Sequence, residues 1–527
     1  MQTKTIEEYR LNQDPDLPDC LQSPNRLFWK KDGISKISPD CKDVFKHLSD
    51  QPFLSPLIKE GEERRPLRVG AVFSGGQAAG GHNVLSGLYD ALKQFHSESR
   101  LFGFLNGPGG LIKGEYEEIT EERINRYRNL GGFDMIGSGR TKIETSDQFQ
   151  KSEKVIRDAD LDGLVIIGGD DSNTNAALLA EYFLEQGVKT RVIGVPKTID
   201  GDLKNADIET SFGFDTATKT YSASIGNILR DSLSAKKYWF FIKLMGRAAS
   251  HIACECALQT HPNLTLIGEE IAKDNRSFQD LVEEIADLVE LRAKNGKNYG
   301  AVLIPEGVIE FIPEFQSMIQ ELNRSSDSLS EKSEHCLKEL PKFIQDQLLL
   351  DRDPHGNVKV SQIETERLFI EAVKEKLAQR KSDVKFNAQP IFCGYEGRSC
   401  LPSIFDSNYC YALGHVAASL INANQTGYMA AIQNLQANVR KWQAAAIPLT
   451  SMIHMEERKG KMKPVIEKAL VELDGPVFSR LSAERENWKS RDDFLYPGPI
   501  QFFGPEDLTH QTTLTLQLTP AKVLETK

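Results

Sequence analysis

The sequence has little of what marks a secreted, membrane-bound or nucleic-acid-binding protein. Eight cysteines in 527 residues are too few for a disulfide-stapled fold, and none forms the C-x2-C pair of a zinc ribbon. No apolar run approaches the roughly 20 residues of a membrane span, and the acidic first twenty residues do not resemble a secretory signal. With 64 basic and 75 acidic side chains, the net charge of −11 disfavours nucleic acid. We expect a cytoplasmic protein with buried reduced thiols and neither a membrane nor a nucleic-acid partner.

Two common nucleotide-binding signatures are also missing. The first strongly apolar run, residues 67–73, ends in Ser74-Gly75-Gly76, and no Walker lysine follows it. The G-x-G-x-x-G pattern of dinucleotide-binding proteins is absent from the same turn. These absences argue against a P-loop nucleoside triphosphatase and against a Rossmann dehydrogenase.

What the sequence does contain is a repeated order of strand, polar turn and helix. Short runs rich in Val and Ile alternate with helical patterns, and each run ends in a Gly-rich or charged turn. Continuous apolar strands of this kind are typical of parallel sheets covered on both faces. We predict an α/β protein with two doubly wound, Rossmann-like domains. The strand-like runs are residues 67–73, 161–167, 192–195, 238–244 and 300–304.

Changes in composition along the chain suggest where these domains begin and end. The first 65 residues are polar and contain scattered prolines, which indicates an extension lying over a domain. Residues 313–385 are rich in Glu, Lys, Ser and Gln with helical spacing, so we predict a helical insertion with a surface turn at 351–356. The predicted units are an N-terminal extension (1–65), a first α/β domain (66–215, completed by a segment near 400–440), a second α/β domain (216–400) and a tail packing on the domains (441–527).

Ligands of doubly wound sheets bind outside the carboxyl ends of the strands, where two acidic clusters of this chain fall. Asp170 and Asp171 follow one strand directly, and adjacent carboxylates there suit a hard cation such as Mg²⁺. The alternative is that one of them caps the next helix. Lys197, Asp200 and Asp202 follow another strand, and an aspartate at such a place can take a proton from a substrate hydroxyl. The alternative there is an Asp-Gly-Asp turn.

Two further turns could hold a phosphate. Gly75 and Gly76 expose backbone N–H groups before a helix, although a glycine pair is also ordinary turn chemistry. Met245-Gly246-Arg247 places a cation after a strand, where the arginine could also form a structural ion pair.

The order of these motifs resembles the phosphofructokinase family. The motifs are SGG (74–76), GGDDS (168–172), PKTIDGD (196–202), MGR (245–247), PEG (305–307) and GYEGR (394–398). The resemblance extends over about residues 67–440. It is strongest to the pyrophosphate-dependent branch of long chains, which also carry an N-terminal extension and a helical insertion.

The resemblance implies substrates, a cofactor and a role for each matched residue. The substrates are fructose 6-phosphate and pyrophosphate, the cofactor is Mg²⁺, and the phosphoryl transfer is reversible. Asp170 matches the metal-associated aspartate, Gly75 the diphosphate-binding glycine and Asp200 the general base, with Asp171, Lys197 and Arg140 as further catalytic residues. The matched sugar-phosphate residues are Thr198, Ile199, Asp200, Asp202, Lys237, Tyr238, Met245, Gly246, Arg247, Glu306, Tyr395, Glu396, Gly397 and Arg398.

Two positions bear on the choice of phosphoryl donor. ATP-using relatives have glycine where this chain has Asp171 and Lys197. A carboxylate at 171 would repel the α-phosphate of a nucleotide, and a lysine at 197 can neutralise pyrophosphate. Both substitutions favour pyrophosphate over an ATP-dependent 6-phosphofructokinase. A non-catalytic regulatory subunit is a further alternative, and it is disfavoured because Asp170 and Asp200 are both present.

The match also implies an oligomer. Lys237 and Tyr238 correspond to positions that reach the sugar phosphate bound by a partner subunit. We therefore expect a homodimer in which the substrate site is shared across subunits.

Overall fold

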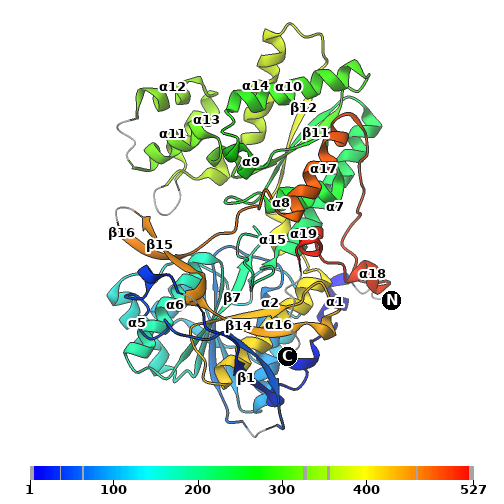
Figure 1. The fold of residues 1–527 in the computed structure, drawn as a ribbon. Coiled ribbons are helices and arrows are strands. Elements are labelled where there is room, and N and C mark those ends of the chain that lie inside the picture. The colour runs from blue at the N-terminus through cyan, green and yellow to red at the C-terminus, as the bar shows by residue number, and fades with distance from the viewer. Residues whose placement is uncertain are drawn as a thin grey trace.

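The protein folds into two lobes, one above the other in Figure 1. The structure is a computed structural model that describes residues 5–35, 37–61, 64–324, 329–352, 357–458 and 461–520. One lobe is built on a ten-stranded sheet and the other on a four-stranded sheet. The α/β class predicted from the sequence is confirmed. The predicted surface turn at 351–356 lies mostly outside the described residues.

The larger sheet has the strand order β1-β2-β14-β13-β7-β6-β3-β4-β5, with β8 paired to β7. Its middle, from β13 to β4, is parallel, whereas the strands at both edges are antiparallel. Ser74 at the end of β3 pairs with Gly168 of β6, which in turn pairs with Pro196 of β7. The turns that follow these three strands therefore lie side by side. The strands are β1 (Leu27–Lys31), β2 (Leu54–Ile58), β3 (Arg68–Ser74), β4 (Arg100–Phe104), β5 (Tyr116–Glu118), β6 (Gly163–Gly168), β7 (Arg191–Thr198), β8 (Phe212–Gly213), β13 (Tyr428–Gln433) and β14 (Gln443–Pro448).

Helices cover both faces of this sheet because its central strands bury alternate side chains in opposite directions. Ala71 and Phe73 of β3 belong to the core shared with α2 and α16, whereas Val72 belongs to the core shared with α6. Helices α2 and α16 approach closely: a Cβ at Gly87 would lie 2.1 Å from the carbonyl oxygen of Tyr411. The helices of this lobe are α1 (Ile6–Leu11), α2 (Gly81–Phe95), α3 (Pro108–Lys113), α4 (Glu121–Asn125), α5 (Ser146–Asp158), α6 (Asp170–Glu185) and α16 (Ile404–Asn422).

The smaller sheet is entirely parallel, in the order β10-β11-β9-β12. Alternate residues of β9 again point into different cores, Ile242 toward α8 and Phe241 toward α10 and α14. The strands are β9 (Trp239–Leu244), β10 (Leu264–Thr265), β11 (Gly300–Pro305) and β12 (Ala388–Cys393). The helices are α7 (Phe214–Ala235), α8 (His251–Thr260), α9 (Gly268–Lys273), α10 (Phe278–Lys294) and α15 (Glu396–Ser399).

Between β11 and β12 the chain forms a group of helices on the outer side of the smaller sheet (Figure 1). Phe315, Leu348 and Phe369 from these helices are buried in one core with Phe241 of β9. Lys243 of β9 also reaches the group, since its Nζ donates to the Ile363 carbonyl oxygen at 3.0 Å. The helices are α11 (Pro313–Arg324), α12 (Glu331–Glu339), α13 (Lys342–Leu350) and α14 (Thr365–Gln379).

The first and last segments that the structure describes are both built into the lobes. Strands β1 and β2 lengthen the larger sheet beyond β14, with Leu54 opposite Ala446. Residues 443–448, which we assigned to a tail, instead form β14 inside that sheet. The run is rich in alanine, which has low strand propensity, so its sequence did not indicate a strand. The remaining elements are β15 (Ile453–Arg458), β16 (Lys461–Ile466), α17 (Pro476–Ser490), α18 (Glu506–Thr509) and α19 (Leu514–Leu518).

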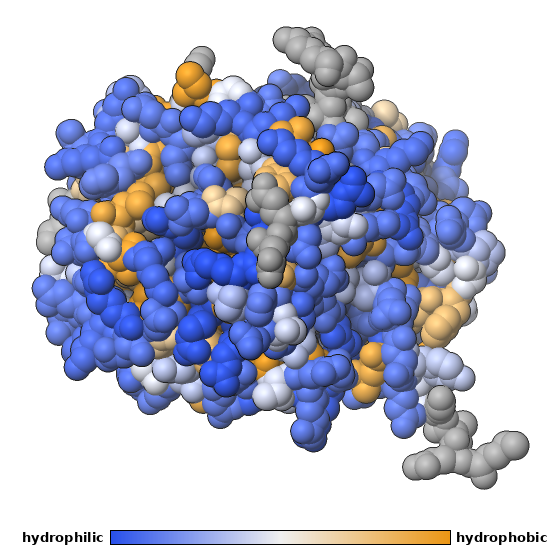
Figure 2. Space-filling view, turned by 90° about the horizontal axis from the view of Figure 1, so that it is seen from below, coloured by the Kyte–Doolittle hydropathy of each residue, from blue (hydrophilic) through white to orange (hydrophobic). Residues whose placement is uncertain are grey.

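The predictions made from cysteine content and apolar runs can be compared with the structure. All eight cysteines are free thiols, and Cys254, Cys256, Cys393 and Cys410 are buried, as predicted. Across the described ranges, none of the helices combines the length and the apolar character needed to cross a bilayer. The face shown in Figure 2 is mostly hydrophilic, with apolar patches scattered over it.

Candidate active site

The glycine turn after β3 forms one wall of the candidate site. Gly75 has a φ of +90°, a conformation that favours glycine, and its N–H donates to the Gly139 carbonyl oxygen at 2.9 Å. Side-chain nitrogens of three cations surround the turn. A Cβ at Gly75 would lie 3.2 Å from Nζ of Lys197, and one at Gly76 would lie 3.4 Å from Arg398 and 3.7 Å from Arg140. A turn surrounded by cations in this way suits an anion.

Lys197 is the most deeply buried of these cations. Its residue is 7 % exposed, and burial lowers the pKa of its ammonium to about 8, although the nearby Asp200 and Asp170 act to raise that pKa. In the described part of the chain, Lys197 has no carboxylate within 4 Å. A buried ammonium without an ion-pair partner is costly. An anionic ligand at the glycine turn would relieve that cost.

Three aspartates lie opposite these cations. Asp170 is the first residue of α6, and Asp200 and Asp202 belong to the turn after β7, where Gly201 has a φ of +74°. The N–H of Asp200 donates to Oγ1 of Thr198 at 3.1 Å, which fixes the start of the turn. Burial, reinforced by the Asp200 charge, raises the pKa of Asp202 to about 7. The turn is therefore both an Asp-Gly-Asp turn and a cluster of acidic groups at the end of a parallel strand.

Asp171 pairs with a lysine and does not cap helix α6. Helix α6 begins after Gly169 without any side-chain cap, so neither aspartate caps it through a hydrogen bond. The Asp171 side chain is 49 % exposed, and one of its oxygens lies 3.1 Å from Nζ of Lys142. Part of its negative charge is thus balanced by a lysine that sequence reasoning did not single out.

The smaller lobe contributes a second anion-binding group. Met245, Gly246 and Arg247 follow β9, and Glu306 follows the neighbouring β11. The buried Glu306 accepts a hydrogen bond from the Gly246 N–H at 3.0 Å. Burial raises the pKa of Glu306, the nearby Asp200 raises it further, and Arg247 opposes the shift. Arg247 is exposed, and across the described residues it has no ion pair, which removes the structural alternative for this arginine.

The GYEGR segment joins this group to the glycine turn of the other lobe. The Tyr395 ring is exposed and lies 4.7 Å from the Arg398 guanidinium. Glu396 accepts from the Gly394 N–H at 2.9 Å, and a Cβ at Gly397 would lie 2.5 Å from the Tyr221 ring. Within the described ranges, the Nε of Arg398 is buried and lacks a hydrogen-bond partner. The segment therefore holds Arg398 between the lobes, where it could contact an anionic group.

Comparisons with known proteins agree with this arrangement of motifs. A family model described as phosphofructokinase matches residues 68–421, which is more than half of the chain. The chain belongs to the phosphofructokinase family. It is 48% identical to a pyrophosphate–fructose 6-phosphate 1-phosphotransferase of Porphyromonas gingivalis, with 97% of both chains covered. Proteins of the same name from Treponema pallidum and Entamoeba histolytica are each 46% identical, over 98% of this chain and 97% and 100% of theirs.

Solved structures support the same phosphofructokinase fold. A pyrophosphate-dependent phosphofructokinase from Nitrosospira multiformis has a TM-score of 0.56 at 17% identity and covers 87% of this chain and 99% of its own. Another from Marinobacter aquaeolei has a TM-score of 0.52 at 20% identity, covering 73% and 83%. At these identities the likeness concerns the fold alone.

Two of the residues matched to the phosphofructokinase pattern lie away from the others. Lys237 and Tyr238 precede β9, whereas Met245, Gly246 and Arg247 follow it. A six-residue strand rises about 20 Å, so the two groups lie at opposite ends of the sheet. The Lys237 Nζ is 5.0 Å from the Tyr238 ring centroid, so the pair packs on itself. These two residues are therefore separated from the candidate site by the length of β9.

Sequence reasoning also missed Lys468, which follows β16. Its Nζ lies 3.6 Å from Oδ2 of Asp170 and 3.7 Å from Oδ2 of Asp202. The apolar run before it, Val465-Ile466, is very short, and no Gly-rich turn follows that run. Its neighbours along the chain therefore carried no signal that could have assigned it to the site.

The acidic groups are compatible with a magnesium ion that is partly held by substrate. Within the described residues there is no group of three or more His, Cys, Asp or Glu side chains that could hold a metal. Mg²⁺ is commonly bound by one or two carboxylates together with substrate phosphates and water. Asp170, beside a turn suited to phosphate, fits that mode of binding.

Proposed function

We propose that the chain is a diphosphate–fructose-6-phosphate 1-phosphotransferase, a pyrophosphate-dependent 6-phosphofructokinase of glycolysis and gluconeogenesis. It moves a phosphoryl group from pyrophosphate to the 1-hydroxyl of D-fructose 6-phosphate, giving fructose 1,6-bisphosphate and phosphate, and it catalyses the reverse reaction. The observation that carries the proposal is the buried ammonium of Lys197. It lies beside the Gly75 turn, its pKa is influenced by Asp170 and Asp200, and it has no ion-pair partner among the described residues. The printed names of relatives at 46–48% identity support it.

In the proposed reaction the substrates meet between the glycine turn and the aspartate turn. Lys197, Arg140 and the N–H groups that follow Gly75 in its turn hold pyrophosphate. The 1-hydroxyl oxygen of the sugar forms a bond to the nearer phosphorus, and the bond from that phosphorus to the bridging oxygen breaks. Asp200 accepts the hydroxyl proton, and free phosphate leaves with the electron pair. The cations balance the charge that develops on the transferred group.

We further propose that Mg²⁺ takes part and that Asp170 holds it together with the phosphates. When bound, the ion would neutralise charge on the donor and orient it. Asp170 lies at the start of α6, beside the aspartate turn and the glycine turn, so it could hold an ion that arrives with pyrophosphate.

The sugar phosphate would bind mainly between the smaller lobe and the GYEGR segment. Arg247 and Arg398 are its proposed 6-phosphate contacts, because both are cations without an ion-pair partner across the described residues. Glu306 fixes the Gly246 backbone and faces the sugar hydroxyls. The other proposed contacts are Thr198, Ile199, Asp202, Met245, Gly246, Tyr395, Glu396 and Gly397.

The choice of pyrophosphate over ATP rests on Lys197 and Asp171. Lys197 lies where it can balance the charge of pyrophosphate at the Gly75 turn. Asp171 is exposed at the start of α6 and would repel the α-phosphate of a nucleotide. Lys142 weakens this repulsion by pairing with Asp171, so we assign the larger share of donor preference to Lys197.

The position of Lys237 and Tyr238 supports a homodimer with shared sites. Since the length of β9 separates both residues from their own site, they would contact sugar phosphate in a partner subunit. We also propose a cytoplasmic location, because eight free cysteines are typical of proteins in a reducing compartment.

The proposal is tested by a donor assay on the full chain. Purified protein is given fructose 6-phosphate with Mg²⁺ and either pyrophosphate or ATP, and fructose 1,6-bisphosphate is measured. We expect turnover with pyrophosphate and little with ATP. Activity with ATP but not with pyrophosphate would contradict the proposal. The absence of activity with either donor would also contradict it.

The role of Asp200 is tested by Asp200→Ser, with Asp383→Ser as a matched control at an exposed site. Loss of a general base should lower kcat by about 10²–10⁴-fold while the affinity for fructose 6-phosphate changes little. The control variant should keep native kinetics. Near-native turnover of Asp200→Ser would remove this residue from the role.

A further inference from the structure

The segment from Ile466 to Val471 crosses from one lobe to the other, and we call it the strap. The Ile466 N–H donates to Oγ1 of Thr174 in α6, at 3.2 Å, in the larger lobe. The Val471 N–H donates to Oε1 of Glu269 in α9, at 3.0 Å, in the smaller lobe. The middle of the strap is thus anchored on both sides of the candidate active site.

Ala469 ties the strap to the aspartate turn itself. Its N–H donates to the Asp202 carbonyl oxygen at 2.8 Å, and its own carbonyl oxygen lies 2.8 Å from Nε2 of the His251 ring. The backbone on the C-terminal side of Lys468 is therefore held at the turn that contains Asp200 and Asp202. This fixes where the lysine side chain can reach.

The ammonium of Lys468 lies among acidic groups without being hydrogen-bonded to them. Its distances of 3.6 Å to Asp170 and 3.7 Å to Asp202 exceed the about 2.7–2.9 Å of a charge-assisted hydrogen bond. Burial lowers the pKa of Lys468, but Asp170, Asp202 and Asp200 together raise it above its usual value. The group is a cation whose N–H bonds are not used by either carboxylate.

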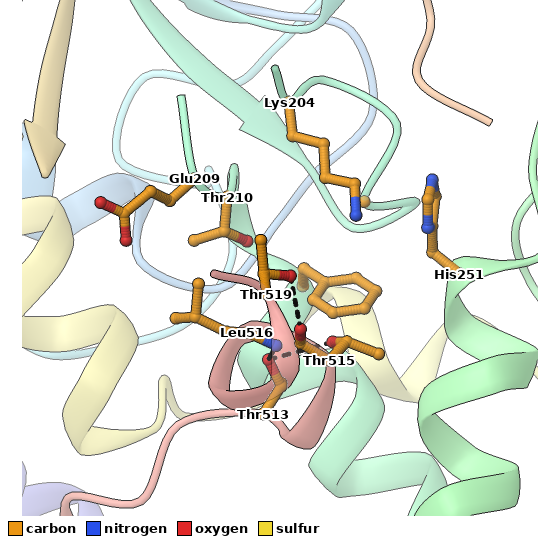
Figure 3. Close-up of a pocket in the computed structure, with 10 residues that line it drawn as sticks. Lys204, Glu209, Thr210, His251, Thr513, Thr515, Leu516 and Thr519 are labelled. Atoms are coloured by element: carbon orange, nitrogen blue, oxygen red, sulfur yellow. Dashed lines mark hydrogen bonds between the residues drawn. The ribbon is translucent and has the colours of Figure 1, made fainter. Parts of the chain in front are cut away.

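His251, which contacts Ala469 of the strap, also lines a small pocket that Figure 3 shows. Residues of the aspartate turn, α8 and α19 line this pocket of about 20 Å³, and Lys204 and His251 are among them. A cavity of this size holds a single water molecule and no phosphate. Helix α19 is itself anchored, because Glu255 accepts from the N–H groups of Leu514 at 2.8 Å and Thr515 at 2.7 Å.

We propose that Lys468 is a binding residue for the phosphoryl donor. Its ammonium donates to a non-bridging phosphate oxygen of pyrophosphate, between Asp170 on the donor side and Arg247 on the sugar side. This inference rests on the proposed function, and it makes the strap part of the active site. Without donor, the same ammonium offsets the charge of Asp170 and Asp202.

The experiment compares Lys468→Met and Lys468→Arg with a matched control, Lys463→Met. Lys463 lies on β16, a few residues earlier, and pairs with Glu144 at the surface. For each full-length protein we would measure KM for pyrophosphate and for fructose 6-phosphate, and the binding of magnesium pyrophosphate by calorimetry without the sugar. Thermal unfolding midpoints show whether the fold is intact.

In Lys468→Met we expect the pyrophosphate KM and dissociation constant to rise at least about tenfold, since a hydrogen bond to a charged group is lost. The KM for fructose 6-phosphate should stay within about threefold. Lys468→Arg should recover part of the affinity, and Lys463→Met should be native. Unchanged pyrophosphate binding, or an equal rise of both KM values with a lower unfolding midpoint, would overturn the proposal.

Failure of this inference can be told apart from failure of the proposed function. If the native chain binds pyrophosphate but transfers no phosphoryl group to fructose 6-phosphate, the proposed function is contradicted. The role of Lys468 in binding pyrophosphate can still be tested by calorimetry. A native chain that does not bind magnesium pyrophosphate overturns both.

Discussion

Replacing Gly307 with alanine should damage the sugar-phosphate side of the site through a single backbone contact. Gly307 follows Glu306 and has a φ of −83°, so alanine can adopt its backbone conformation without strain. A Cβ at this position would, however, lie 1.7 Å from the carbonyl oxygen of Arg247. Because the contact is to backbone, no flexible side chain can move aside to relieve it.

The size of the effect follows from that distance. To reach an acceptable separation of about 3.0 Å, the Arg247 backbone must move by about 1.3 Å. The 3.0 Å hydrogen bond from the Gly246 N–H to Glu306 cannot survive such a shift. Misplacement of binding groups by about 1 Å can cost about 10²-fold in rate, equivalent to about 2.7 kcal/mol. We expect a loss of this order in kcat/KM for fructose 6-phosphate.

The assay is steady-state kinetics with each substrate varied in turn, together with the thermal unfolding midpoint. The binding of magnesium pyrophosphate, measured without the sugar, should be nearly unchanged, because the Gly75 turn is not touched. Gly61→Ala is the matched control, since Gly61 has no positive φ and a Cβ there would lie 3.6 Å from the nearest atom. A Gly307→Ala enzyme with kcat/KM for fructose 6-phosphate within about threefold of native would refute the reasoning.

Two further predictions concern stability. Burial lowers the folded-state pKa of His415 to about 4, so between about pH 6.5 and 4 the unfolded chain binds a proton that the folded chain does not, and stability falls on acidification. Between pH 8 and pH 5, the free energy of unfolding of His415→Gln should therefore fall by about 2 kcal/mol less than that of the native protein, as measured by urea unfolding. An equal fall in both proteins would contradict the assigned role of His415. Glu366 lies 3.4 Å from Nζ of Lys243, and both are buried, so Glu366→Leu should cost about 3–5 kcal/mol by leaving the lysine unpaired. The double variant Lys243→Met/Glu366→Leu should regain most of that stability, and failure to do so would show that the charge pair is not the cause.

The residues at the glycine and aspartate turns could be predicted from the sequence because each follows its own strand. Gly75, Asp170 and Asp200 come directly after apolar runs, and parallel strands bring such turns to one edge of a sheet. The same rule predicts the place of Glu306, which comes directly after β11 of the smaller sheet. For these residues, the local sequence was enough to predict their place, together with the rule that turns after parallel strands meet at one edge of the sheet.

The sequence did not indicate the extent of the larger sheet. Half of the residues of strand β14 are alanine, and the segment becomes a strand because β13 and β2 pair with it. The edge strands β1 and β2 come from the N-terminal extension, nearly 400 residues before β14. Pairing over such distances depends on tertiary contacts that no local propensity expresses.

By itself, the sequence determined the α/β class, the order of the motifs and the glycine-rich and acidic turns, because these depend on residues that are neighbours along the chain. Only the tertiary structure decided that Lys142 pairs with Asp171, that Lys237 and Tyr238 pack on each other, and that Lys468 lies beside Asp170 and Asp202. The physical reason is that electrostatic interactions act through space. A lysine 268 residues after Asp200 carries no signal in its own neighbourhood, and the strap that brings it there is held by hydrogen bonds from both lobes.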